Sequence, residues 1–462
     1  MDEIFYRSAT QMLADLAAKR ISARELLEAH AARNEALHAE LNMIIATDLD
    51  RARQDAHVID DQRAKGAPLD ALAGLPMTIK DGFDVEGLPA VAGNPAYKMR
   101  EARCADAVLA ARARAAGAVL WGKSNVPYML GDFQTYNPVY GATNNPYDVT
   151  RTPAGSSGGA AAALAAGVTP LEIGSDIGGS LRHPANFCGV HALKTTWGQL
   201  PTRGHAPPGP DHYIPIDLAV MGPMARTARD VRLLQGVLRG APSASPRPIK
   251  GRRVAVWLEE PGFKVGEDAR AAVMRAGEAL SHHGAEVRAA KPSIDGGALL
   301  DAYFGLLNPI MAAGFPKAML ARFEAQRGED EAAVRAGADR YSAPAARLQY
   351  GARYHEVAAH MAAREALKDR LAAFFEEGWD AILTPISPVA AFPHNQKEGY
   401  FERTLLCDGA PIAYPLMLDW IALATALHAP ALAAPAGQTG EGLPIGVQLV
   451  GRWNEVDSLL DV

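Results

Sequence analysis

Glycine and other small residues are concentrated in one part of this sequence, and they constrain the fold more than any other feature. The segment from Gly155 to Gly167 reads GSSGGAAAALAAG, and Gly174 to Arg182 reads GSDIGGSLR. Glycine loses much conformational freedom on folding, so it is tolerated at this density where the chain turns sharply or brings its amides close to a ligand. Gly178, Gly179 and Ser180 leave room for successive N–H groups to converge on one point, as stabilisation of an oxyanion requires.

Short apolar runs alternate with helical segments around this glycine-rich region. Leu72 to Thr78 is a short apolar run punctuated by Gly and Pro, Asp106 to Ala116 has the pattern of a helix, and Ala118 to Trp121 has that of a short buried strand. Ala160 to Ala166 predicts a further helix, and Thr169 to Ile173 predicts a further strand. Alternation of strands with helices predicts an α/β sheet.

The chain is predicted to form a single large α/β domain over residues 1–462. Composition changes at residues 241–250, where APSASPRPIK indicates a surface loop or linker. Residues 290–375 form a predicted helical excursion, because Ala, Arg and Glu recur there without strand patterning. We expect this excursion to wall the substrate pocket.

Composition excludes several classes of function. The formal net charge of −6 gives no basic surface of the kind that nucleic-acid binding requires, so we expect no nucleic-acid partner. No run approaches the ~20 apolar residues of a membrane-spanning helix, so no membrane partner is expected. The first residues, MDEIFYRSA, lack the apolar core of a signal peptide, and the three cysteines are Cys104, Cys188 and Cys407. An odd number of widely spaced cysteines fits a reduced, cytoplasmic protein.

Several motifs in this order resemble the amidase signature family, in its bacterial amidase branch. Between residues 60 and 240, the core signature region, they are PMTIKDGFD at 76–84, GKSNVP at 122–127, YGATNNPYD at 140–148, GSSGG, GSDIGGSLR and FCGVHALK. Further matches are MGPMARTARD at 221–230, AILTPISP at 381–388 and GLPIGVQLVG at 442–451, so the resemblance covers nearly the whole chain. It implies the amidase-signature fold: a large twisted mixed β-sheet core covered by helices on both faces, in three α/β/α layers.

The resemblance also implies a catalytic triad. Ser180 matches the family's nucleophile, Lys80 matches its base, and Ser156 matches the bridging serine that follows a cis peptide bond after Gly155. A serine hydroxyl is a poor nucleophile until a base takes its proton, and lysine can do so only when neutral. The ordinary lysine pKa of about 10.4 must therefore fall through burial or nearby positive charge.

Further site residues follow from the same resemblance. The amides of Ile177, Gly178, Gly179 and Ser180 match the oxyanion hole. Residues that match substrate-contacting or supporting positions are Leu130, Gly155, Ser157, Asp176 and Arg182. The sequence departs from the family's pattern at Ala154 and Thr195. It also stops at Val462, soon after the last matching motif, and whether the C-terminus is trimmed stays open.

Three other patterns have weaker interpretations. Gly117 to Ser124 spells GAVLWGKS and satisfies the phosphate-binding pattern GxxxxGK[ST], but AVLW favours a strand and Pro127 disfavours the helix that should follow. GSSGG also satisfies G-x-S-x-G, the elbow of α/β-hydrolases, with Ser157 as nucleophile in an esterase. His355 and His360 are five residues apart and do not share a helix face as a zinc pair would.

The resulting hypothesis is an amidase that hydrolyses the C–N bond of a small or aryl carboxamide through an acyl-enzyme. An anilide, a carbamate (urethane) or an ester could be cleaved by the same groups. Aromatic side chains expected at the pocket are Tyr128, Phe133, Tyr136, Tyr414 and Trp420. We expect no metal or organic cofactor. The expected partner is a small-molecule amide or carbamate substrate, and a homodimer is left open.

Two other functions are kept for comparison. One is the glutamine-hydrolysing component of a tRNA-dependent amidotransferase, which would work beside a partner protein. The other is a non-catalytic binding protein on the same scaffold, which is disfavoured because Lys80 and both serines are present.

Overall fold

The computed structural model describes residues 3–98, 105–205 and 215–462. Cys104 and most of the loop after His205 lie outside these described residues. The chain begins with helices α1 (Glu3–Tyr6), α2 (Ala9–Ala17) and α3 (Ala23–Leu41). Ser22 and Glu25 form a reciprocal capping box at the start of α3, in which each side chain accepts a hydrogen bond from the other residue's backbone N–H.

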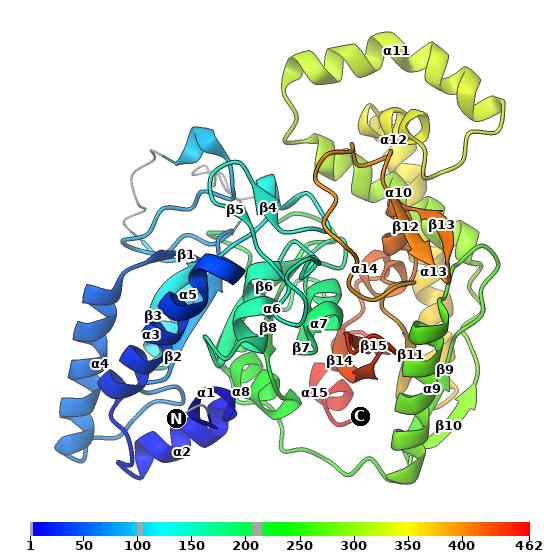
Figure 1. Ribbon diagram of the computed structural model, residues 1–462. Coiled ribbons are helices and arrows are strands. Elements are labelled where there is room, and N and C mark those ends of the chain that lie inside the picture. Colours follow the sequence, from blue (N-terminus) through cyan, green and yellow to red (C-terminus); the bar gives the residue numbers. More distant parts are fainter. Residues whose placement is uncertain (1–2, 99–104, 206–214) are drawn as a thin grey trace.

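A mixed sheet of eleven strands crosses the described part of the molecule (Figure 1). Its strand order is β1-β3-β2-β6-β8-β7-β14-β15-β11-β9-β10. β2 pairs in parallel with both β3 and β6, whereas β8, β7, β14 and β15 pair antiparallel with their neighbours. The strands are β1 (Ile44–Thr47), β2 (Pro76–Lys80), β3 (Val119–Ser124), β6 (Leu171–Asp176), β7 (His191–Lys194), β8 (Val220–Ala225), β9 (Arg253–Val256), β10 (Glu286–Ala289), β11 (Ala381–Pro385), β14 (Ala431–Gln438) and β15 (Pro444–Gly451).

Helices cover both faces of this sheet, as the predicted three-layer α/β/α architecture requires. One buried apolar cluster joins the sheet to α2, α3, α4 (Leu49–Ala64), α5 (Val108–Ala115), α8 (Ala228–Arg239), α9 (Glu267–His282) and α15 (Val456–Leu459). A second cluster contains buried apolar residues of α6 (Gly158–Ala165), α7 (Arg182–Cys188), α10 (Gly296–Ala312), α13 (Tyr354–Glu376) and α14 (Ala422–Ala426). The remaining elements are α11 (Lys317–Arg335), α12 (Ala343–Tyr350), the 3₁₀ helices η1 (Pro95–Tyr97), η2 (Tyr128–Leu130) and η3 (Tyr414–Leu418), and the hairpins β4–β5 (Tyr136–Asn137, Gly141–Ala142) and β12–β13 (Thr404–Cys407, Ala410–Ala413).

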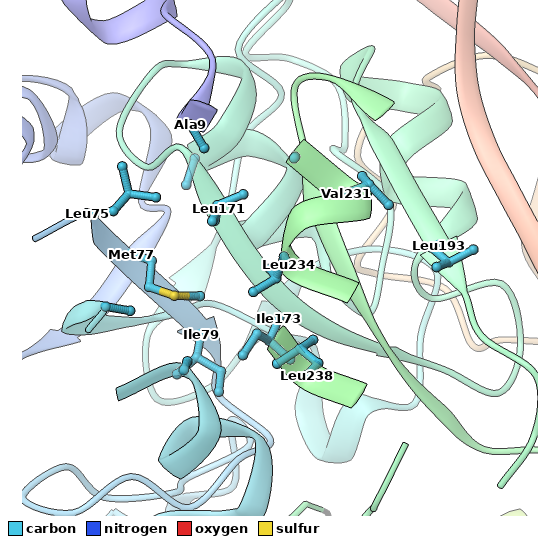
Figure 2. Close-up of a cluster of buried hydrophobic side chains, with 14 of the residues drawn as sticks. Ala9, Leu75, Met77, Ile79, Leu171, Ile173, Leu193, Val231, Leu234 and Leu238 are labelled. Carbon is cyan, nitrogen blue, oxygen red and sulfur yellow. The ribbon is translucent and has the colours of Figure 1, made fainter. Parts of the chain in front are cut away.

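Strand alternation decides which residues of β2 and β6 reach the two faces. Figure 2 shows Met77 and Ile79 of β2 with Leu171 and Ile173 of β6 in the cluster that packs under α8. Successive side chains of a strand point to opposite faces. The residues between these apolar ones, including Thr78 and Lys80, are therefore directed to the other face, where α6 and α7 lie.

Residues 296–376 form the helices α10 to α13, within the segment that the sequence assigned to a helical excursion. In Figure 1, α11 and α12 stand at one end of the molecule, apart from the sheet. The apolar run at 118–121 continues as β3 through Ser124, so Val119 to Ser124 is a strand and not part of a phosphate-binding loop before a helix. No helix among the described residues is both long and apolar enough to cross a bilayer.

Truncating one buried leucine of α8 tests the packing in Figure 2. Leu234 is fully buried against the sheet, so Leu234→Ala should lower the free energy of unfolding by about 2–5 kcal/mol. Leu406 is 71% exposed, and Leu406→Ala should change it by only about 0.5 kcal/mol. Urea denaturation of both variants measures the difference; equal stabilities would contradict this packing.

Candidate active site

Lys80 is the last residue of β2, and its side chain is completely buried. Its Nζ donates hydrogen bonds to Ser156 Oγ and Ser157 Oγ, both at 2.8 Å, and to Ser175 Oγ at 2.9 Å. The carbonyl oxygen of Ser175 lies 3.3 Å from the same nitrogen. The amine is therefore surrounded by uncharged oxygens, and no carboxylate is paired with it among the described residues.

This environment changes the acidity of the amine. Burial lowers the pKa of Lys80 to about 7, against the opposing influence of the carboxyl groups of Asp176 and Glu172. An ammonium loses its hydration when buried, so the neutral form becomes favoured near physiological pH. A neutral amine has a free lone pair and can accept a proton from a neighbouring hydroxyl.

The two serines beside Lys80 come from the turn that precedes α6. The peptide bond between Gly155 and Ser156 is cis, as the resemblance implied. Glycine is required after the serines because a Cβ on Gly159 would lie 2.4 Å from the backbone nitrogen of Asn125. The backbone N–H of Ser157 donates to the carbonyl oxygen of Ser180 at 3.2 Å, so the two serine-containing turns are in direct contact.

Ser180 lies in the turn between β6 and α7. Ser180 is 7% exposed, whereas Ser156 is 2% exposed and Lys80 is fully buried. Gly179 occupies a left-handed backbone conformation with φ of +86°, which glycine adopts without strain. Among the three residues that the sequence places in the triad, Ser180 is thus the most accessible to a substrate.

Asp176 organises the backbone of this turn. Its carboxylate accepts hydrogen bonds from the N–H of Gly179 at 2.9 Å and from the N–H of Leu181 at 3.1 Å. The Gly179 amide, one of the four amides predicted for the oxyanion hole, therefore has an acceptor within the turn. The amides of Ile177, Gly178 and Ser180 have no acceptor within the described part of the chain.

A buried ion pair holds Asp176 in place. Arg182 donates from Nη2 to Asp176 Oδ1 at 2.9 Å, and both side chains have no solvent exposure. Although burial opposes it, the guanidinium keeps the pKa of Asp176 well below its usual range. Arg182 also donates to Gln448 of β15 and Thr425 of α14, which anchors the turn to the C-terminal third of the chain.

Helix α10 approaches the same turn from the other side. The hydroxyl of Tyr303 donates to the carbonyl oxygen of Ile177 at 2.9 Å. Sequence reasoning missed Tyr303, and it also missed Ser175, although Ser175 stands inside the GSDIGGSLR motif. The motif was a signal for Ser175, whereas nothing in the local sequence indicates that Tyr303 reaches this turn.

Leu130 belongs to η2, which follows β3 on the chain. Its backbone has a positive φ of 63°, and that of the preceding Met129 is 50°. A Cβ placed on Gly82 would lie 3.2 Å from a methyl group of Leu130 and 2.9 Å from Nε2 of His205. Leu130 and His205 therefore approach each other above the residues that follow Lys80.

Aromatic rings gather beside the nucleophile turn. The His183 ring lies against Gly179, and the Phe133 ring contacts it edge-on at 5.3 Å between centroids. Phe133 in turn contacts Tyr400 at 5.9 Å and Tyr414 at 5.3 Å. These contacts connect an aromatic wall, defined as Phe133, Tyr400 and Tyr414, to the segment that carries Ser180.

A charged network supports this wall from behind. Asp132 accepts hydrogen bonds from Arg403 and from the Tyr414 hydroxyl, both at 2.6 Å, and Arg403 donates to the Tyr136 hydroxyl at 2.7 Å. Tyr136 and Tyr414 are thus both hydrogen-bonded to this network. Trp420 does not join them, because it packs against Trp257 and Phe263. Tyr128 is 51% exposed.

The alternative motifs lack the geometry that they require. Lys123 of the GxxxxGK[ST] pattern is buried and forms an ion pair with Asp81 at 2.7 Å, so it is not free to bind phosphate. His355 and His360 both lie on α13, and no group of three or more His, Cys, Asp or Glu side chains is arranged to hold a metal ion in the residues described here.

Comparison with known proteins agrees with this arrangement. The Amidase family matches residues 25–460. AtzE of Pseudomonas sp. (strain ADP), which is part of 1-carboxybiuret hydrolase, is 31% identical over 96% of this chain and 95% of its own length. The A component of the glutamyl-tRNA(Gln) amidotransferase of Anaeromyxobacter sp. (strain K) is 32% identical over 95% of this chain and 91% of its own.

Solved structures show the same relationship. The inhibitor-bound structure of a vestigial complex of an s-triazine catabolic enzyme superposes with a TM-score of 0.81 at 29% identity, covering 98% of this chain and 97% of that one. The similarity in fold and in sequence thus extends over nearly the full length of both chains. We conclude that this chain belongs to the Amidase family and is a hydrolase acting on carbon–nitrogen bonds other than peptide bonds.

Proposed function

We propose that the protein is an amidase that cleaves the C–N bond of a small or aryl carboxamide through a Ser180–Ser156–Lys80 triad and an acyl-enzyme. The observation that supports this most strongly is the buried Lys80 amine, which lies 2.8 Å from Ser156 Oγ. A lysine with a pKa of about 7 is a competent base at neutral pH. Ser–Lys arrangements are a known alternative to a histidine-based triad.

The proposed first half of the reaction moves one proton along the triad. Lys80 takes the proton of Ser156, and Ser156 takes the proton of Ser180 as Ser180 Oγ attacks the carbonyl carbon. The N–H groups of Ile177, Gly178 and Ser180 are the donors available to the oxyanion that forms. The proton returns through Ser156 to the departing amine as the C–N bond breaks.

Water completes the cycle. It attacks the acyl carbon, gives a proton to the same Ser156–Lys80 relay, and regenerates the Ser180 hydroxyl as the carboxylic acid leaves. No metal or organic cofactor enters these steps. Asp176 and Arg182 act as positioning residues, because they hold the backbone of the nucleophile turn and do not reach the reacting atoms in this scheme.

The aromatic wall supports an uncharged, planar substrate. Its rings lie beside His183 and Gly179, while Asp132 and Arg403 behind it neutralise each other. A charged acyl group would find no unpaired opposite charge in this wall. Small or aryl amides are therefore the preferred class, and anilides, carbamates and esters of similar shape are candidates for the same chemistry.

The amidotransferase relatives support a second candidate function, glutamine hydrolysis beside a partner protein. The discriminating experiment uses the isolated chain, without ATP or tRNA, on a panel of simple amides, anilides, carbamates, esters and glutamine. Turnover of simple aryl amides by the isolated chain supports the amidase. Activity on glutamine alone, appearing only with a partner, would overturn it.

Removing the proposed nucleophile should abolish catalysis. Ser180→Ala is expected to lower kcat by about 10⁴-fold or more and to prevent covalent labelling by a fluorophosphonate. Ser157→Ala is the matched control, since it removes a neighbouring hydroxyl that also contacts Lys80. Mass spectrometry of the labelled protein should find the adduct on Ser180; an adduct on Ser157 would contradict the proposal and favour the elbow nucleophile.

Activity should follow the ionisation of Lys80. The amine accepts a proton only when neutral, so kcat/KM should rise about tenfold per pH unit below the pKa of about 7 and level off above it. Lys80→Met keeps the length of the side chain but removes the base, and it should lower kcat/KM by about 10³-fold. A pH–rate profile of both proteins measures this; near-normal turnover by the methionine variant at neutral pH would remove Lys80 from the mechanism.

A further inference from the structure

Glu172 is a completely buried carboxyl group that the proposed mechanism does not use. It lies on β6 directly opposite Thr78 of β2, and the Thr78 hydroxyl donates a hydrogen bond to its Oε1. Its Oε2 is buried and has no basic partner among the described residues, although the nearby Ser124 hydroxyl favours the ionised carboxyl. An unpaired buried carboxylate oxygen is costly when charged, so its presence calls for a specific role.

Glu172 faces the same side of the sheet as the base. Figure 2 shows its neighbours Leu171 and Ile173 in the cluster under α8, so strand alternation directs Glu172 to the opposite face. Lys80 is directed to that face as well, two residues along β2 from Thr78. The two ionisable groups are therefore near neighbours on the central strands.

The helix that covers Glu172 and Lys80, α6, consists of Gly, Ala and Leu and carries no ionisable side chain. His205 also lies near Lys80, but burial lowers its pKa to about 3, so it stays uncharged at neutral pH. Ser124 contributes an uncharged hydroxyl from β3, and Met224 stands opposite Glu172 on β8. Asp176, four residues along β6, also acts on Lys80, but Arg182 neutralises it in a buried ion pair.

Glu172 is thus the carboxyl group near Lys80 that has no basic side chain hydrogen-bonded to it among the described residues. Burial raises the pKa of Glu172 to about 8, although the Thr78 hydrogen bond opposes this, and burial lowers the pKa of Lys80 to about 7. The two ionisations overlap, and each group's charge favours the charged form of the other. When one proton is shared by the pair, it can reside on the carboxyl or on the amine.

We propose that Glu172 is a positioning residue that sets the protonation state of Lys80. With the proton on Glu172, the lysine amine is neutral and accepts the Ser156 proton. With Glu172 ionised, the carboxylate holds Lys80 as an ammonium, which cannot act as a base. This inference rests on the proposed role of Lys80, and it assigns to Glu172 the control of the pH at which catalysis begins.

Glu172→Gln tests the assignment. Glutamine keeps the volume and an acceptor oxygen for Thr78 but cannot carry the negative charge that stabilises the lysine ammonium. If the shared proton divides evenly between the two groups, the acid limb of the kcat/KM profile should move to lower pH by about 0.3 unit, which raises the relative rate at low pH about twofold. Glu260→Gln is the matched control, because Glu260 is another buried acid but pairs with Lys291 near β9, at the far end of the sheet; its acid limb should not move.

A second variant gives an independent readout. Thr78→Val removes the hydrogen bond that favours the Glu172 carboxylate, so the acid limb should shift in the same direction by a smaller amount. Thermal unfolding of each variant establishes that it is folded. An unmoved or oppositely moved acid limb in folded Glu172→Gln overturns the inference, as does loss of activity at every pH. If that variant does not fold, an unmoved limb in Thr78→Val overturns it.

The outcomes also separate this inference from the proposed function. Full activity of Lys80→Met would show that Lys80 is not the base, and would therefore contradict the proposed mechanism. An unshifted profile in folded Glu172→Gln, together with an inactive Lys80→Met, would leave the mechanism standing and remove only the role of Glu172.

Discussion

The buried amine of Lys80 is the interaction on which the rest of the site depends. A lysine ordinarily keeps its charge in water, and here the sheet removes that water while supplying hydroxyls and one carbonyl in its place. Each nearby element contributes to this environment: β2 places the amine, the turn before α6 supplies Ser156, and β6 supplies Ser175. The proposed nucleophilic chemistry at Ser180 becomes feasible because one charge is suppressed.

Carboxyl groups near the amine are treated in two different ways. Asp176 is kept ionised by Arg182, and its carboxylate oxygens accept hydrogen bonds from backbone amides. Its charge therefore helps to fix the conformation of the turn. Glu172 has no such partner, and burial raises its pKa. In the proposal above, a proton on Glu172 leaves Lys80 neutral, and loss of that proton favours the lysine ammonium.

The fold and the members of the proposed triad could be predicted from the sequence because ordered motifs specify both. Lys80, Ser156 and Ser180 each stand in a short motif, and the strands that position two of them are visible as apolar runs. The occupied amide of Gly179 was not predictable, since it depends on how Asp176 turns back on its own loop. Long-range contacts such as those of Tyr303 with Ile177 and of Trp420 with Trp257 depend on packing between segments that no local pattern relates.

The anchoring of Arg182 has a consequence for biosynthesis. Its guanidinium reaches Thr425 and Gln448, residues that are translated more than two hundred positions after it. Until those residues emerge from the ribosome, the turn around Ser180 has its local contacts to Asp176 but lacks these distant ones. The packing around the proposed nucleophile is therefore completed only after residues far along the chain have been translated.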